Sequence, residues 1–196
     1  MEKLDQVTKI GQDGIRAILR EIEKCGLRVR LHPAVATDED LGRICGSTIE
    51  VVEDPLERTI EAFTLCHLFG HMIQFTTLSQ YEKLLGAVSG TPPTQLSDNF
   101  WSAFYAYELE AYGYGGTLLE NSLPADDVLR SRYATFMELD FNHFRIYTTT
   151  GNRLDRTRYR EKLLQSYNRP VTTLIKPLPI SGVNWSNLST LEARII

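Results

Sequence analysis

The sequence of 196 residues lacks long apolar runs, has few cysteines and carries no excess of basic side chains. Because no stretch of about 18 consecutive apolar residues exists, we expect no transmembrane helix and no membrane partner. The first residues, MEKLDQVTKIGQDG, are polar and include acids, which is not typical of a secretory or transit signal. These absences predict a cytoplasmic protein.

Cysteine usage and charge exclude further classes. The three cysteines, Cys25, Cys45 and Cys66, form no Cys-x-x-Cys pair, and their odd number favours reduced thiols over a disulfide framework. The formal net charge is −4, the pI is near 5.6, and the lysines and arginines are scattered. We therefore expect no direct nucleic-acid ligand. The sequence also has no internal repeat, no phosphate-binding glycine loop and no Ser-His-Asp order.

The composition, 42% hydrophobic and 23% charged, is typical of one globular domain, here residues 1–196. Its periodicity predicts an α+β fold. We expect a helix near 5–25, strands at 27–31, 43–46 and 47–52 with a hairpin around Gly46, and helices at 57–77, 101–119, 124–147 and 155–167. Prolines and glycines interrupt residues 168–196, so we expect this tail to wrap the domain in an extended path or to dock on a second copy of the chain.

The expected helix 57–77 contains the most informative pattern, the two histidines His67 and His71. Residues four apart on a helix lie on one face, about 5 to 6 Å apart at Cβ, which suits two nitrogens that bind one metal ion. The helix is apolar on nearly all sides, so it should lie in the core. A buried polar group without a partner costs about 1 to 3 kcal/mol. A metal would satisfy both imidazoles, although hydrogen bonds to carbonyls or a carboxylate are the alternative.

A third ligand is sought in the expected helix 101–119, which contains Glu108 and Glu110. Two residues apart on a helix, these side chains point about 200° away from each other, so only one can face the histidines. Glu110 has small and aromatic residues on its own side, a surface suited to close helix packing. We therefore choose Glu110 as the third ligand and expect Glu108 to be solvated.

These motifs together resemble one protein family. The strand Ile49-Glu50-Val51, then Phe63-Thr64-Leu65-Cys66-His67-Leu68-Phe69-Gly70-His71, and later Glu108-Leu109-Glu110-Ala111 resemble the ImmA/IrrE family of zincin-like metallopeptidases. The resemblance covers residues 1–120 and implies a small sheet packed on a pair of metal-ligand helices. It leaves 121–167 as a helical extension and 168–196 as a tail. It also implies that His67, His71 and Glu110 bind zinc.

The chain departs from the family at one important position. The family's His-Glu-x-x-His motif has a glutamate that serves as general base, and this chain has Leu68 there. Cys66 replaces a small residue of the family and is interpreted as core packing.

Three interpretations remain open. The first is a degenerate zincin that keeps zinc and acts by binding a protein partner, since the family often cleaves or binds transcriptional regulators. The second is an enzyme of the non-haem iron type with a small-molecule substrate, because two histidines and one carboxylate also suit Fe(II). The third is a hydrolase whose general base comes from elsewhere. Candidates for catalytic or orienting roles are His143, Tyr107 and Tyr114, with Glu108 as a further possible base and with core packing as the alternative for the tyrosines.

Overall fold

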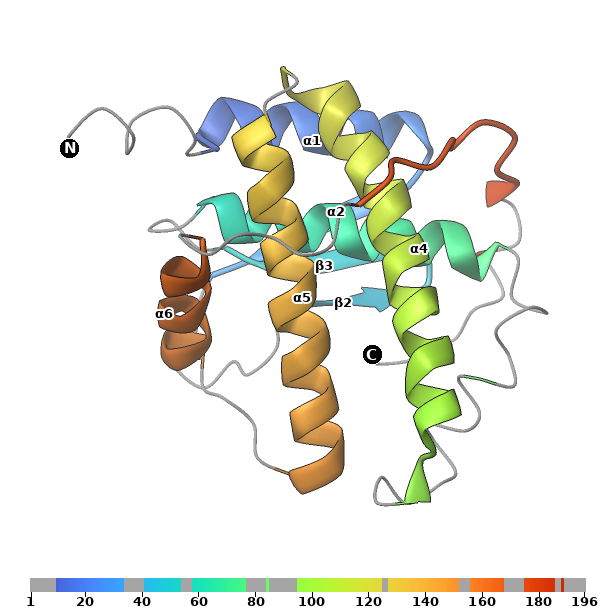
Figure 1. Cartoon of the computed structure of the whole chain (residues 1–196). Coiled ribbons are helices and arrows are strands. Elements are labelled where there is room, and N and C mark those ends of the chain that lie inside the picture. The colour runs from blue at the N-terminus through green and yellow to red at the C-terminus, as the bar shows by residue number, and fades with distance from the viewer. Residues whose placement is uncertain are drawn as a thin grey trace.

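A computed structural model of the chain describes residues 10–33, 41–53, 58–76, 84, 95–124, 127–151, 156–167, 175–185 and 188. Five helices and three strands are defined within these ranges (Figure 1): α1 Gln12–Lys24, β1 Arg28–His32, β2 Gly42–Cys45, β3 Thr48–Val52, α2 Arg58–Phe75, α4 Asp98–Ser122, α5 Asp127–Thr150 and α6 Arg156–Ser166. The predicted α+β class is confirmed. No helix in the described part of the chain is long and apolar enough to cross a membrane.

The sheet has the order β1-β3-β2, with β1 parallel to β3 and β2 antiparallel to β3. The predicted hairpin around Gly46 is confirmed as the β2–β3 turn, where Gly46 has a φ of 57°. Ile49 and Val51 of β3 are fully buried. Because side chains alternate along a strand, these two residues share one face of the sheet, and helix α2 packs on this sheet.

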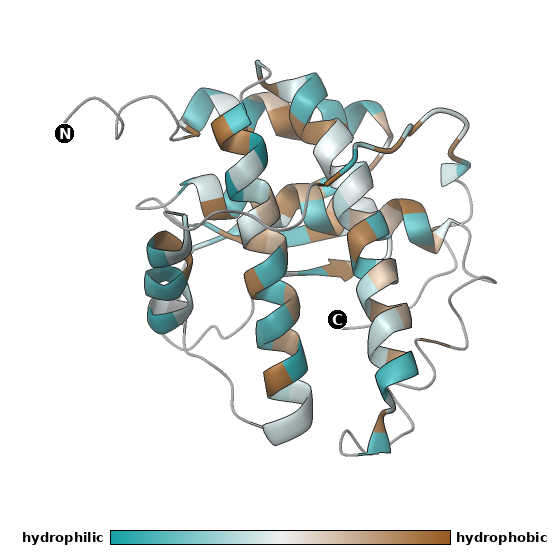
Figure 2. Cartoon of the chain, in the orientation of Figure 1, coloured by the Kyte–Doolittle hydropathy of each residue, from teal (hydrophilic) through white to brown (hydrophobic). Residues whose placement is uncertain are grey.

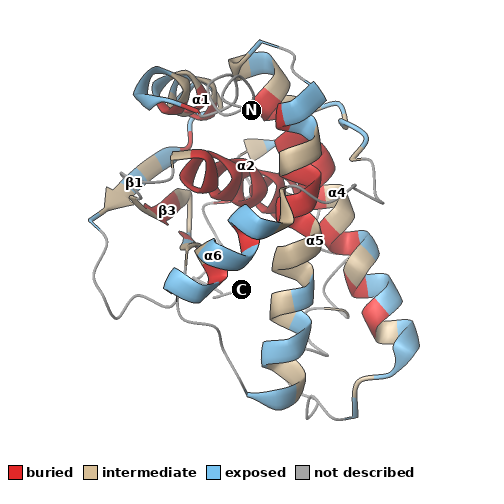
Figure 3. Ribbon diagram, turned by 60° about the vertical axis from the view of Figure 1, so that its left-hand side comes forward, coloured by how far each residue is buried: buried red, intermediate tan, exposed pale blue. Residues whose placement is uncertain are grey.

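Helix α2 forms the centre of the molecule. Every residue from Thr59 to Phe75 is buried, as the continuous red helix in Figure 3 shows. The sheet, α1 and α4 all pack against it. A helix that is apolar on all sides can only be stable when other elements surround it, so the predicted core position is confirmed.

Helices α2 and α4 cross at very short range. A Cβ atom on Gly70 of α2 would overlap the backbone of Ala111, and one on Gly115 of α4 would overlap the carbonyl oxygen of Cys66. Each helix therefore presents a glycine where the other helix's backbone passes. This close approach brings the side chains on either side of the crossing within contact distance.

Helix α5 extends three residues beyond the expected end at 147. The hydroxyls of Thr149 and Thr150 donate to the carbonyls of Arg145 and Ile146 within the same helix. The helix stops at Gly151, whose φ of 71° lies in the left-handed region that favours glycine.

Helix α6 is predominantly hydrophilic (Figure 2) and contributes the buried side chains Tyr159 and Leu163. It packs against α5. Its attachment to the core therefore depends on few apolar groups.

The described part of the tail, 175–185, contacts the core of its own chain. The backbone N–H of Leu178 donates to the Gly113 carbonyl at 3.0 Å, and the Thr117 hydroxyl donates to the Leu178 carbonyl at 2.6 Å. The Trp185 ring lies 5.8 Å from that of Phe69. Residues 175–184 run without helix or strand, and the segment lies beside α4 (Figure 1). Self-association through the tail stays a prediction, and residues 168–174 and 189–196 lie outside the described ranges.

Candidate metal centre

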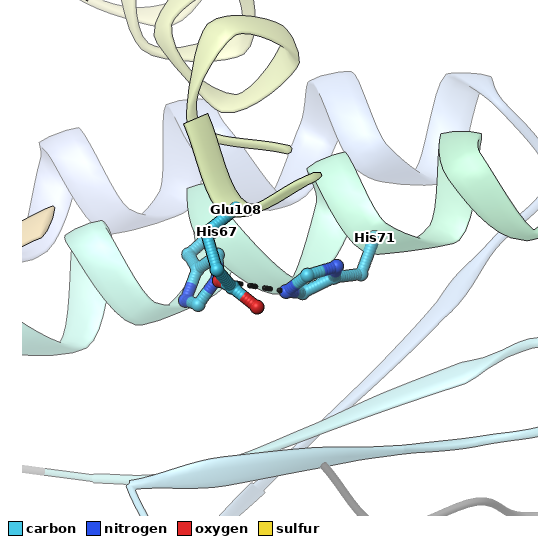
Figure 4. A group of neighbouring side chains, drawn as sticks. All are labelled: His67, His71 and Glu108. Carbon is cyan, nitrogen blue, oxygen red and sulfur yellow. Dashed lines mark hydrogen bonds and ion pairs between the residues drawn. The ribbon is translucent and has the colours of Figure 1, made fainter. Parts of the chain in front are cut away.

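His67 and His71 of α2 meet Glu108 of α4 in the interior (Figure 4). One ligand atom from each residue lies within 4.8 Å of the other two. The Oε2 atom of Glu108 is 2.9 Å from Nε2 of His67 and 3.4 Å from Nε2 of His71. The three residues are 9%, 1% and 6% exposed in the order His67, His71 and Glu108. Both imidazoles thus direct the same ring nitrogen toward one buried carboxylate.

The helix crossing explains why these three side chains meet. Gly70 is three residues after His67, so it shares the face of α2 that carries both histidines. Ala111, which lies against Gly70, is three residues after Glu108 and shares a face of α4 with it. The contact between Gly70 and Ala111 therefore places the Glu108 carboxylate over the histidines.

The geometry differs from the sequence prediction in the third residue. Glu108, which was expected to be solvated, is buried beside the histidines, whereas Glu110 accepts a hydrogen bond from Nε2 of Gln74 at 2.9 Å. The reason is that the small residues that allow close approach, Ala111 and Gly115, are three and seven positions after Glu108. That spacing is the signal in the sequence that indicates which glutamate faces the histidines.

The proton position on His71 is fixed by Gln74. Nε2 of Gln74 donates to the Tyr107 carbonyl at 2.7 Å and to Glu110, so the amide oxygen faces Nδ1 of His71 at 2.9 Å. An amide oxygen only accepts, so Nδ1 of His71 carries the proton. Nε2 of His71 makes no hydrogen bond and lies 3.4 Å from the Glu108 carboxylate.

His67 is held by different groups. Its Nδ1 lies 3.4 Å from Oδ2 of Asp140 on α5, and its ring stacks on Tyr112 with centroids 4.1 Å apart. Sequence reasoning did not assign Gln74 or Asp140 to the site. A signal existed for Gln74, because it is a polar residue three positions after His71 in an otherwise apolar helix. Asp140 was equally polar within an aromatic helix, but the sequence gave no indication of which helix it faces.

The electrostatics of Glu108 keep it ionised. Burial raises the pKa of this carboxyl, but the charge of His71 in its protonated form, followed by the hydrogen bond with His67, outweighs burial and lowers the pKa to about 2. A buried carboxylate that remains charged requires positive charge beside it. The site is therefore built to hold a cation or a protonated imidazole.

The residues considered for catalysis lie outside the group of three, and of them Tyr107 contacts it. Tyr107 packs on His71 with ring centroids 5.0 Å apart, and burial followed by the charge of Glu108 raises its pKa. Burial and then Glu110 raise the pKa of Tyr114, which is half-buried. The ring of His143 lies 5.2 Å from that of Tyr159. Both tyrosines hold their protons at neutral pH, which suits hydrogen-bond donors and not general bases.

Leu68 and Cys66 complete the comparison with the expected motif. Leu68 is buried and lies close to Gly42 of strand β2. Cys66 is fully buried, and burial raises the pKa of its thiol, which keeps it unreactive. The interpretation of Cys66 as core packing agrees with this position.

No protein-family model matches the chain, and neither the curated proteins nor the solved structures contain a significant match. The functional argument consequently depends on the site geometry.

Proposed function

We propose that this protein binds one divalent metal ion, zinc in the first place, through Nε2 of His67, Nε2 of His71 and a carboxylate oxygen of Glu108. We further propose that it is a degenerate zincin-like protein of the ImmA/IrrE type that acts by binding a protein partner. The proposal keeps both histidines of the resemblance and replaces Glu110 by Glu108 as the third ligand.

The observation that carries the proposal is the orphaned Nε2 atom of His71. Its lone pair and the Glu108 carboxylate oxygen are two acceptors that face each other at 3.4 Å in a buried site. A cation between them removes the repulsion. Zinc binds histidine nitrogen and carboxylate oxygen at about 2.0 to 2.2 Å, which requires ligand atoms roughly 3 to 3.5 Å apart. The 2.9 and 3.4 Å separations around Glu108 are close to that requirement.

The surroundings of the two imidazoles give independent support. Metal-binding histidines usually donate their second N–H to a carboxylate, carbonyl or water, which fixes the ring. His71 meets the amide oxygen of Gln74 through Nδ1, and His67 lies beside the carboxylate of Asp140 through Nδ1. Both rings thus have the arrangement in which Nε2 is the metal ligand.

The residues argue against efficient peptide hydrolysis. Bound zinc lowers the pKa of a water ligand to about 7, but a general base must still accept the proton. Leu68 stands at the base position, and loss of a general base costs about 10² to 10⁴ in rate. The three candidate ligands are at most 9% exposed, so a peptide bond has no direct access to them. These features favour a structural or sensing metal and function through binding.

The alternative is a non-haem iron enzyme with a small-molecule substrate. Its support is the donor set itself, because two histidines and one carboxylate also form the triad of Fe(II) oxygenases, which require no glutamate base. Metal identity separates the two candidates.

The decisive experiment is metal analysis of the purified protein, followed by thermal unfolding with and without added Zn²⁺. We expect about one zinc per chain, and removal by a chelator should lower the melting temperature. One iron per chain with an oxygen-dependent signal would favour the alternative, and absence of any stoichiometric metal from protein that also fails to bind Zn²⁺ would refute both.

A second measurement addresses catalysis. We expect Leu68→Glu to bind zinc and to remain without peptidase activity, as a site specialised for binding would. Peptidase activity gained in Leu68→Glu would instead mean that only the base has been lost.

A further inference from the structure

We propose that Asp140 of α5 is a positioning residue that orients His67 for metal binding and couples the metal centre to helix α6. This inference rests on the proposed metal site. It goes beyond that proposal because it assigns a function to a carboxylate outside the ligand set and to the helical extension that follows the core.

The proposal starts from the contacts of the Asp140 carboxylate. Oδ2 lies 3.4 Å from Nδ1 of His67 and accepts a hydrogen bond from the Tyr112 hydroxyl at 3.0 Å. Oδ1 accepts a hydrogen bond from the Tyr159 hydroxyl at 3.2 Å. These partners come from α2, α4 and α6, so one side chain of α5 joins four helices. Its side chain is 29% exposed, which leaves it at the margin of the buried centre.

The two hydroxyls fix the direction of the carboxylate. Each phenol O–H donates to a different oxygen of Asp140, so the plane of the carboxylate cannot turn without loss of one hydrogen bond. Tyr112 also stacks on the His67 ring at an interplanar angle of 18°. The same tyrosine thus restricts the rotation of both the histidine and its carboxylate partner.

A metal on Nε2 of His67 strengthens this arrangement. A neutral imidazole that binds metal through Nε2 carries its proton on Nδ1, where Asp140 can accept it. The carboxylate increases the basicity of the imidazole, as carboxylate partners of metal-binding histidines do. At His71, Nδ1 meets the uncharged amide of Gln74. In the described part of the chain, Asp140 is therefore the carboxylate that faces an Nδ1 atom of this histidine pair.

The contact with Tyr159 extends the coupling to α6. This helix supplies the buried side chains Tyr159 and Leu163 to the core, and the hydrogen bond from Tyr159 to Asp140 joins it to α5 beside the metal centre. A metal on Nε2 would make Nδ1–H of His67 a stronger donor to Asp140, whose carboxylate also accepts the bond from Tyr159. Metal binding should therefore stabilise the packing of α6.

The test compares the zinc affinity of the wild type with that of Asp140→Asn and Tyr159→Phe, measured by competition with a chelating dye. We expect Asp140→Asn to bind zinc about 10- to 100-fold more weakly. Tyr159→Phe should weaken binding less, by roughly 3- to 10-fold, because the Asp140 carboxylate loses one of its three contacts. Tyr133→Phe is the matched control, since this buried hydroxyl makes no hydrogen bond in the described structure, and zinc affinity should be unchanged.

Two further readouts separate positioning from general stability. The visible spectrum of bound Co²⁺ should change in Asp140→Asn, and the gain in melting temperature on addition of zinc should be smaller than in the wild type. A folded Asp140→Asn protein with wild-type zinc affinity and an unchanged Co²⁺ spectrum would overturn the inference. If Asp140→Asn does not fold, equal affinities of Tyr159→Phe and Tyr133→Phe would overturn it. Failure of the wild type to bind zinc would instead overturn the proposed metal site itself.

Discussion

Glu108 is the residue on which the candidate site depends most. It is buried, stays ionised with a pKa near 2, and lies within 3.4 Å of both histidine Nε2 atoms. Its neighbour two positions on, Glu110, is partly exposed and accepts a hydrogen bond from Gln74. Two chemically identical side chains on one helix thus have different surroundings because of the direction in which each points.

The first prediction concerns this pair of residues. Glu108→Gln should lower zinc affinity by more than about 100-fold, because a neutral amide replaces a charged ligand. Loss of a direct ligand costs more affinity than loss of a residue that only hydrogen-bonds to a ligand. Glu110→Gln is the matched control and should lower affinity by less than about 10-fold, because its amide oxygen can still accept the bond from Gln74. Isothermal titration with Zn²⁺ measures both, and the opposite ranking would restore Glu110 as the ligand.

The residues of the site were predictable to different degrees. The spacing of His67 and His71 indicated a metal pair directly, because a helix places residues four apart side by side. The choice between Glu108 and Glu110 depended on which face of α4 meets α2. Small residues lie near both glutamates in the sequence, and the backbone contacts of Ala111 and Gly115 decide which face of α4 meets α2. Asp140 could not be assigned, since its contact with His67 joins residues 73 positions apart on separate helices.

At the scale of elements, the α2–α4 crossing determines the site. The two backbones touch at Gly70 and at Gly115, and the candidate ligands lie beside the first of these contacts. A larger side chain at Gly70 would have to separate the helices, because the neighbouring atoms belong to the backbone of Ala111 and cannot move aside.

The second prediction tests this crossing. Gly70→Ala should lower the free energy of unfolding by about 3 kcal/mol, the upper end of the usual cost of overpacking, and should weaken zinc binding by moving Glu108 away from the histidines. Denaturant unfolding and metal titration provide the two values. Gly11→Ala is the control, because a Cβ atom at Gly11 meets nothing within 4 Å, and its effect should stay under about 1 kcal/mol. Equal stability of the two variants would contradict the close packing.

The elements themselves were largely predictable from local patterns. Alternation located all three strands to within about one residue, and the glycine at position 46 identified the hairpin. The parallel pairing of β1 with β3 was not predictable, because strand order depends on how α1 and α2 cover the sheet. Helix α5 passed the expected stop at Thr148 because its threonine hydroxyls bond to carbonyls of the same helix.

At the scale of the whole molecule, stability depends on carboxylates that must stay charged. Glu50 on β3 is buried under Arg43 and Arg30, at 2.7 and 3.0 Å. The hydrogen bond from Arg43 lowers its pKa; burial opposes this, while the charges of Arg43, His32 and Arg30 add to the lowering. The pKa of Glu108 is lowered as well. A carboxyl whose pKa is lower in the folded than in the unfolded chain stabilises the fold above its unfolded pKa, and this contribution is lost as the pH falls through the folded value.

The third prediction follows from the lowered pKa values of Glu50 and Glu108. The free energy of unfolding should be nearly constant from pH 7 to about 5 and should decrease as the pH falls from about 4.5 toward 2. In Glu50→Gln the decrease should be shallower, because one of the protonation steps is removed. Glu120→Gln is the control with the same change in charge at a surface pair with Arg130, which should contribute little. Urea unfolding at a series of pH values measures the slopes, and identical slopes for wild type and Glu50→Gln would contradict the role of Glu50.

The hydrogen bonds between the tail and α4 have a consequence for biosynthesis. Gly113 and Thr117 find their partner at Leu178, and Phe69 meets Trp185, so the ligand-bearing helices acquire their outer cover only after residue 185 has left the ribosome. Until then the nascent chain holds both histidines and Glu108 on helices that lack this cover.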